Sequence, residues 1–191
     1  RPRMIGAGYG ATYSGPTAGP GWHAQGSLAF YRASPALRAE AYALAQSGTA
    51  TGSPLACGEQ VRQFYCLGRE DRSTFAGAGL ALALEGSIAG GRLRPYARLG
   101  GGVYHQRVET TEFEGPTGIC VDGREIVSCP DNPPFGSFSR SFNRTGPGVG
   151  VAVGVRGRLG GVSVFAEAAS HAAKMGSGSA GAAPLTFGVS L

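Results

Sequence analysis

The chain has 191 residues, of which 34 are glycine and only 15% are charged, and its 17 basic residues exceed its 12 acidic residues. That length suits one all-β domain, and a charged fraction below the usual ~25% favours a surface that lies largely in lipid or in an interface. The arginines are scattered, and no segment reaches the ~18 apolar residues of a transmembrane helix. The sequence therefore excludes a helical membrane span and predicts no nucleic-acid partner.

Alternation of apolar and polar residues, which is typical of a β-strand with two unlike faces, recurs along the chain. Near the N-terminus Trp22, Leu28 and Phe30 share one face. Later, Leu80 and Leu84 alternate with small residues. Strands are predicted at 4–13, 22–32, 37–46, 74–86 and 93–109.

Gly6, Gly8 and Ala11 form a near match to a dinucleotide-binding fingerprint. That motif requires a helix after it, whereas a Gly/Pro segment follows here. We expect no cofactor.

The strongest alternation lies in 149–172. Valines occupy every second position from Val149 to Val155, and the pattern resumes after a glycine-rich turn at 157–161. It predicts a hairpin with one aliphatic face and one face that carries Arg156 and Glu167. A last strand is predicted at 184–191.

The eight predicted strands are joined alternately by long loops and short turns. The longest loops, 47–73 and 110–147, fall on the same side of an up-and-down arrangement, and the even strand number places both termini at the short-turn end. We predict an all-β fold, an eight-stranded antiparallel up-and-down β-barrel that forms a single domain over 1–191.

This layout, together with the alternating final strand 184–191, resembles the small eight-stranded outer-membrane β-barrels of Gram-negative bacteria, the OmpA/OmpW-like group. The resemblance implies a bacterial outer-membrane location, outer-membrane lipid as the surroundings, and a structural or interaction role. The outward face of several strands is nevertheless rich in alanine and glycine, as at Ala39, Ala41 and Ala97. Such a face suits close packing of barrel on barrel, so a self-assembling extracellular subunit of a homo-oligomer or surface complex remains open.

Six charged residues fall on the inward face of the predicted strands. Because an eight-stranded barrel is only wide enough for its own side chains, charges inside it must be paired. We expect an ion-pair network that plugs the barrel, with a gated ion path as the alternative, formed by Arg38, Glu40, Glu85, Arg98, Arg156 and Glu167.

The four cysteines lie in the two long loops, at Cys57, Cys66, Cys120 and Cys129. No CxxC spacing indicates a metal site. An even number of cysteines in the loops of an exported protein predicts two disulfides, and the local pairing 57–66 and 120–129 is preferred among the three connectivities.

Catalysis has weak support in the sequence. His23, His105 and His171 invite comparison with lipid A deacylase-like barrel enzymes, and Ser170 adjoins His171. Adjacent strand residues point to opposite faces, so Ser170 and His171 cannot form a catalytic pair. We expect no catalytic residues and no enzyme.

Aromatic residues are concentrated in the two long loops. Loops of this length are usually functional or disordered, and aromatic side chains are enriched in protein interfaces. We expect a non-catalytic barrel that binds a partner through a loop surface that contains Phe64, Tyr65, Phe113, Phe135, Phe138 and Phe142.

Overall fold

The computed structural model describes residues 3–14, 17–52, 65–116, 119–121, 124–126, 136–160 and 162–191. Among these residues no helix has the length and apolar character needed to cross a membrane; the one helical turn that they contain is η1 (Ala89–Gly91). The remaining elements are strands, namely β1 (Arg3–Ser14), β2 (Thr17–Arg32), β3 (Leu37–Gly52), β4 (Tyr65–Glu85), β5 (Leu93–Pro116), β6 (Ile119–Val121), β7 (Arg124–Ile126), β8 (Gly136–Leu159), β9 (Val162–Met175) and β10 (Gly178–Ser190).

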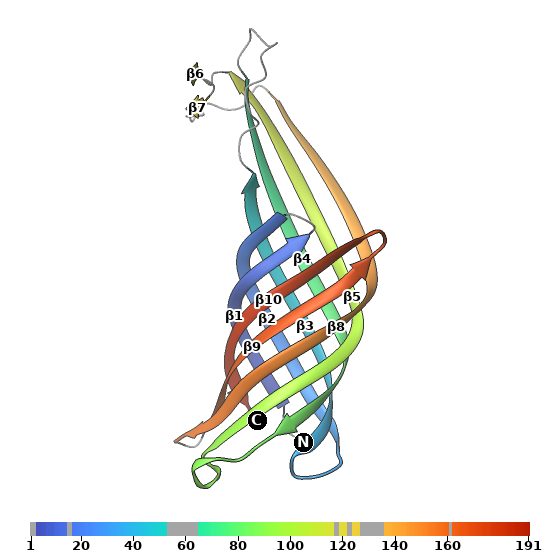
Figure 1. Ribbon diagram of the computed structural model, residues 1–191, viewed down its shortest axis with the longest axis vertical. Helices are drawn as coiled ribbons and strands as arrows, with labels where there is room; N and C mark the ends of the chain where they lie inside the picture. The colour runs from blue at the N-terminus through green and yellow to red at the C-terminus, as the bar shows by residue number, and fades with distance from the viewer. Residues whose placement is uncertain are drawn as a thin grey trace.

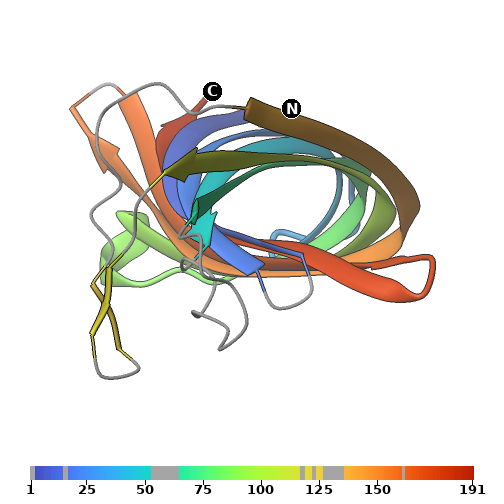
Figure 2. The ribbon, with the colours of Figure 1, turned by 90° about the horizontal axis from the view of Figure 1, so that it is seen from above.

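Eight of the strands close into an antiparallel barrel in the order β1-β10-β9-β8-β5-β4-β3-β2 (Figures 1 and 2). Pairing of β1 with β10, from Met4 opposite Ser190 to Ser14 opposite Ala180, completes the ring. The short strands β6 and β7 form a separate two-stranded sheet between β5 and β8. The predicted eight-stranded up-and-down fold is confirmed, and both termini lie at the short-turn end (Figure 1).

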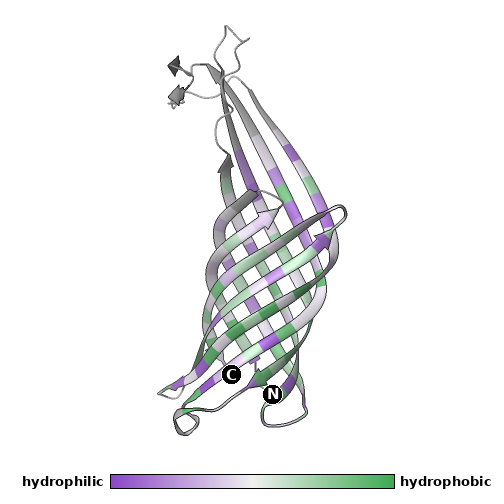
Figure 3. Ribbon diagram, in the orientation of Figure 1, coloured by the Kyte–Doolittle hydropathy of each residue, from purple (hydrophilic) through white to green (hydrophobic). Residues whose placement is uncertain are grey.

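The outer face of the barrel carries an apolar band. Large hydrophobic side chains point outward from every barrel strand, because period-two alternation places all of them on one side of the sheet. Figure 3 shows this concentration over the lower part of the barrel. Its exposed members include Ile5, Trp22, Leu28, Phe30, Leu80, Leu82, Leu84, Leu99, Val103, Val149, Val151, Val153, Leu185, Phe187 and Val189.

The predicted loop boundaries were wrong, because the strands run further than the apolar pattern does. β3 continues to Gly52 and β4 starts at Tyr65, inside the predicted loop 47–73. β5 and β8 likewise take up much of the predicted loop 110–147. Residues 14–21 and 175–183, which lie outside the predicted strands, are also mostly strand. These extensions consist largely of polar residues, glycine, alanine and proline, so they lack the alternation of large apolar and polar residues that marks a strand in sequence.

The barrel is much taller on one side than on the other. β5 and β8 have 24 residues each, whereas β1 has 12 and β10 has 13. A strand needs only about 9–11 residues to cross a bilayer, so β4, β5 and β8 continue beyond their neighbours (Figure 1). We call this extension the tall wall and define it as residues 65–73, 108–116 and 136–142.

Candidate functional site

The lower part of the barrel interior holds a cluster of ion pairs around Glu85. Its carboxylate pairs with Arg38, with Arg156 at 3.2 Å and with Arg94 at 3.3 Å. Arg38 also pairs with Glu40. Glu85 is the last residue of β4 and points inward, so one carboxylate serves three guanidinium groups at the mouth of the barrel.

A second cluster is centred on Glu167 of β9. Arg98 donates to one carboxylate oxygen at 2.6 Å, and Gln25 donates to the same oxygen at 2.7 Å. Tyr96 donates its hydroxyl to the other oxygen at 3.0 Å. Arg98 also lies 3.8 Å from Glu40, which joins the two clusters. The structure thus brings all six inward-facing charged residues of the sequence analysis together inside the barrel.

Above these ion pairs the interior is aromatic. The Tyr104 hydroxyl lies 2.7 Å from the Tyr42 hydroxyl and 3.3 Å from Nδ1 of His171. Phe75 stacks on Tyr104 with ring centroids 5.2 Å apart. Leu44 and other apolar side chains complete this cluster.

These layers close the interior to solvent. Phe75 and Tyr104 have no exposed surface, and Gln46, Gln106 and Glu167 are almost fully buried. Side chains that line an open pore would be wetted. The hydrogen bonds and ion pairs of these layers therefore connect non-neighbouring strands across the interior of the barrel.

The three histidines do not form a catalytic arrangement with Ser170. His171 is buried in the lumen while Ser170 on the same strand points outward, as the strand pattern predicted. His23 lies inside beside Gln25 at 3.3 Å. His105 lies on the outer face, where Nδ1 is 2.9 Å from the Thr145 hydroxyl. No group of His, Cys, Asp and Glu residues suited to a metal ion occurs in the described parts of the chain.

Most of the predicted aromatic loop surface belongs to strands instead. Tyr65, Phe113 and Phe138 lie in β4, β5 and β8, where the backbone alone is described. Phe142 of β8 is exposed and lies under the guanidinium of Arg144, 4.7 Å from its ring centroid. Phe64 and Phe135 fall outside the described residues.

The cysteine predictions also fall largely outside the described residues. This applies to Cys57 and Cys129, while Cys66 in β4 and Cys120 in β6 are described by their backbones alone. The two disulfides remain predictions.

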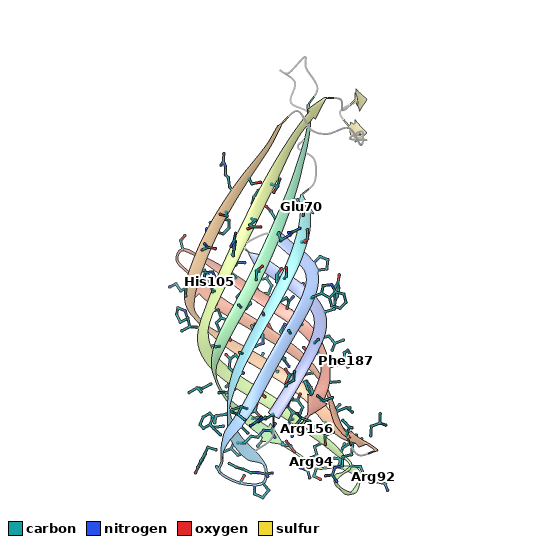
Figure 4. The ribbon with its side chains drawn as sticks, turned by 180° about the vertical axis from the view of Figure 1, so that it is seen from behind. Glu70, Arg92, Arg94, His105, Arg156 and Phe187 are labelled. Carbon is teal, nitrogen blue, oxygen red and sulfur yellow. The ribbon has the colours of Figure 1, made fainter. Side chains whose placement is uncertain are left out.

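Sequence reasoning missed a group of arginines at the short-turn end. Arg92, Arg94 and Arg158 gather with Arg156 around one cavity there (Figure 4). The available signal was their spacing: Arg156 and Arg158 share one face of a strand, and Arg92 precedes Arg94 by two residues at the start of another. These four arginines, which are far apart in the sequence as two pairs, therefore lie close together in the structure.

The tall wall presents polar groups across its strands. The hydroxyl of Thr110 donates to Asp71 at 2.6 Å, and the hydroxyls of Thr111 and Ser139 lie 3.3 Å apart. Exposed ion pairs join Arg72 to Glu70 and Arg107 to Glu109. The hydroxyl contacts connect neighbouring strands, whereas each ion pair lies within one strand. Asp71 and Thr110 are buried on the inner face, and the ion pairs lie on the outer face.

No protein-family model and no curated protein sequence matches the chain. The fold is similar to that of Neisserial surface protein A, with a TM-score of 0.56, 12% sequence identity and coverage of 100% of this chain and 95% of that chain. A lower TM-score, 0.49, relates it to the attachment invasion locus protein Ail of Yersinia pestis in complex with the heparin analogue sucrose octasulfate, at 11% identity and with 100% and 98% of the two chains covered. The N-terminal β-barrel domain of Pseudomonas aeruginosa OprF gives 0.41, at 13% identity, over 100% and 97%. The chain therefore has the fold of the small eight-stranded outer-membrane β-barrels, as its strand pattern predicted.

Proposed function

We propose that this chain is a non-catalytic barrel of the bacterial outer membrane that binds a partner through the tall wall and the segments that connect its strands. The proposal is based on the order in which three layers of different polarity are arranged in the barrel. A closed, ion-paired interior lies inside an apolar outer band, and the tall wall, whose sequence is mostly polar, rises beyond that band.

The apolar band supports a membrane location. Leu80, Leu82 and Leu84 each leave about 60% of their surface exposed, and water would make such a continuous band costly at roughly 25 cal/mol per Å² of apolar surface. Lipid removes that cost. Tyr9 and Trp22 form an edge-to-face pair on the outer face, 5.7 Å between centroids, as in the aromatic girdles of membrane barrels.

The closed interior supports a structural role for the six charged residues. A gated ion path would need a wetted route past Phe75 and Tyr104, and both are fully buried. Hydrogen bonds to Glu167 on β9 from Gln25 on β2 and Arg98 on β5 connect strands that are not neighbours in the barrel.

The height of the tall wall supports partner binding. β5 exceeds β10 by 11 residues (24 against 13), or roughly 36 Å along the strand at about 3.3 Å per residue. A barrel that only sealed itself in lipid would not need this extension. Its exposed side chains Arg140 and Phe142, with Arg144 next to them on β8, offer a mixed polar and apolar contact surface.

Trp22 provides the test of membrane location, because it is the sole tryptophan and 76% of its surface is exposed on the outer face. The protein would be folded into vesicles of phosphatidylcholine with brominated acyl chains. We expect strong quenching of Trp22 fluorescence relative to unbrominated vesicles, and extraction from native membranes only with detergent. Unquenched Trp22 and recovery in a detergent-free supernatant would contradict the proposal.

One observation favours a second candidate, association of one barrel with another. An apolar groove of about 410 Å³ lies at β1, β2 and β3, where Gly26, Ala41 and Ala43 are flanked by Ile5 and Leu28. Small residues allow two barrels to approach closely. Sizing in detergent distinguishes the candidates, since a monomer that stays monomeric at high concentration excludes this contact.

A further inference from the structure

We propose that the short-turn end of the barrel binds the phosphate group of an anionic phospholipid in an arginine-lined pocket. The pocket has a volume of about 270 Å³. Arg92, Arg94, Arg156 and Arg158 line it, together with Ser163 and Ser190. The proposal rests on the outer-membrane location proposed above.

Three of the arginines lie on neighbouring strands, and the fourth lies in the turn before β5. Arg94 on β5 lies directly opposite Arg156 on β8 in the strand register. Arg158 is two residues further along β8 toward the short-turn end and therefore on the same face as Arg156, and Arg92 immediately precedes β5 at that end. Like charges placed opposite one another destabilise a sheet unless something neutralises them.

The side-chain carboxylates at this end are fewer than the guanidinium groups. Glu40, Glu85 and Glu167 match Arg38, Arg98 and Arg156 in number, which leaves Arg92, Arg94 and Arg158 in excess. The other nine of the 12 acidic residues lie at sequence positions 59 to 131, in the tall wall or the segments that connect its strands.

Two guanidinium groups are free to take a ligand. Within the described parts of the chain, Arg92 and Arg158 make no ion pair, and the buried Nε of Arg156 has no hydrogen-bond partner. Arg94 and Arg156 keep Glu85 as a shared partner at 3.3 and 3.2 Å. Guanidinium groups bind phosphate with paired, charge-assisted hydrogen bonds, and the hydroxyls of Ser163 and Ser190 add donors.

The surroundings of the pocket favour a lipid as the source of that phosphate. Leu159 and Leu191 are more than 70% exposed at the same end, and Leu93 and Val162 are exposed beside them. These side chains lie at the short-turn end of the apolar band. A phospholipid whose acyl chains pack against the band from outside the barrel would therefore have its headgroup at the level of the pocket. Figure 4 shows Arg92, Arg94 and Arg156 together at this end.

The turn before β5 contributes to the geometry. Gly90 and Gly91 adopt φ values of 67° and 83°, which favour glycine over residues with a Cβ. Their tight turn brings Arg92 back over the barrel mouth, where it lines the pocket with Arg158.

The test uses native mass spectrometry of the folded, detergent-solubilised protein with equimolar phosphatidylglycerol and phosphatidylcholine. We expect wild type to retain phosphatidylglycerol in preference, and the double variant R92Q/R158Q to bind it about tenfold more weakly, since charge-assisted hydrogen bonds are lost. The matched control R72Q/R140Q removes two arginines from the tall wall and should bind like wild type. Equal retention by wild type and R92Q/R158Q overturns the proposal.

Competition with two other anions tests whether the ligand of the pocket is a phospholipid. Displacement of the lipid by inorganic phosphate at equal concentration, or preferential retention of a soluble peptidoglycan fragment with its carboxylates, would overturn the assignment to phospholipid. Gel mobility before and after boiling is recorded for each sample. A folded, heat-modifiable barrel that binds no lipid contradicts this inference alone, whereas a protein that needs no detergent contradicts the proposed function.

Discussion

Gly77 leaves the space that the Tyr104 ring occupies in the barrel interior: a Cβ on Gly77 would lie 2.2 Å from that ring. The ring cannot retreat easily, because Phe75 stacks on it and Tyr42 and His171 hold its hydroxyl. The absence of a side chain at one position on β4 therefore fixes the aromatic layer that closes the lumen.

The variant Gly77→Ala is expected to lower the free energy of unfolding by about 1–3 kcal/mol, the usual cost of overpacking. Urea titration of the protein in lipid vesicles, followed by Trp22 fluorescence, measures it. Gly101→Ala is the control, because the nearest atom to its added Cβ is 3.6 Å away. Equal stability of the two variants would contradict the packing argument.

The ion pair between Arg98 and Glu167 gives a second prediction. Glu167→Gln removes the negative charge that accepts hydrogen bonds from Arg98, Gln25 and Tyr96. Loss of one partner in a buried pair costs about 3–5 kcal/mol, so we expect a clear drop in the urea midpoint. Glu109→Gln, which breaks an exposed pair with Arg107, should cost less than about 1 kcal/mol.

Lipid contact predicts a difference between two positions on β8. Val151→Arg places a charge in the apolar band, at a cost of about 2–4 kcal/mol near the bilayer midplane. Ser141→Arg changes an exposed residue of the tall wall on the same strand and should be neutral. Folding yield into vesicles measures both. If Val151→Arg folds as well as Ser141→Arg, the band does not face lipid.

Because the lumen is closed, we predict that the barrel does not conduct ions. Wild type in a planar bilayer should show no stable conductance steps, because Phe75 and Tyr104 are fully buried across the path. The double variant F75A/Y104A should admit ions. Steady conductance by the wild-type barrel would show that these layers open.

The cysteine prediction is tested chemically. Mass mapping of the unreduced protein should find Cys57 joined to Cys66 and Cys120 joined to Cys129, with no free thiol before reduction. Each bridge would add about 2–4 kcal/mol of stability to its segment by limiting the unfolded chain. A linkage between the two segments would show one of the other two connectivities.

The sequence predicted the barrel and the position of its termini because lipid and lumen impose opposite polarities on alternate residues. That contrast is strong at Val149 to Val155 and in 80–84, and the strands there are where the pattern placed them. It also assigned the six inward charges to the correct face. The pattern disappears at Thr49 and Thr110, where both faces are polar, and there strand was mistaken for loop.

The arginine pocket could not be predicted in the same way. Arg94 and Arg156 lie 62 positions apart, and only the pairing of β5 with β8 brings them opposite each other. The intervening segment contains its own small sheet of β6 and β7, so chain order alone does not give the register. The arginines are dispersed in the sequence, so the sequence alone did not indicate that their positive charges lie close together in the fold.

The uneven height of the barrel leaves a long edge of β8 without a neighbour in the described chain. β8 pairs with β9 over residues 148–159 alone, so the side of β8 that faces away from β5 has no partner strand in the described chain over 136–147. An unpaired edge invites strands of other molecules to add to the sheet, and Pro and charged side chains discourage it. Arg140, Arg144 and Pro147 occupy this edge. The tall wall can thus stand in water beside many copies of itself without polymerising through its backbone.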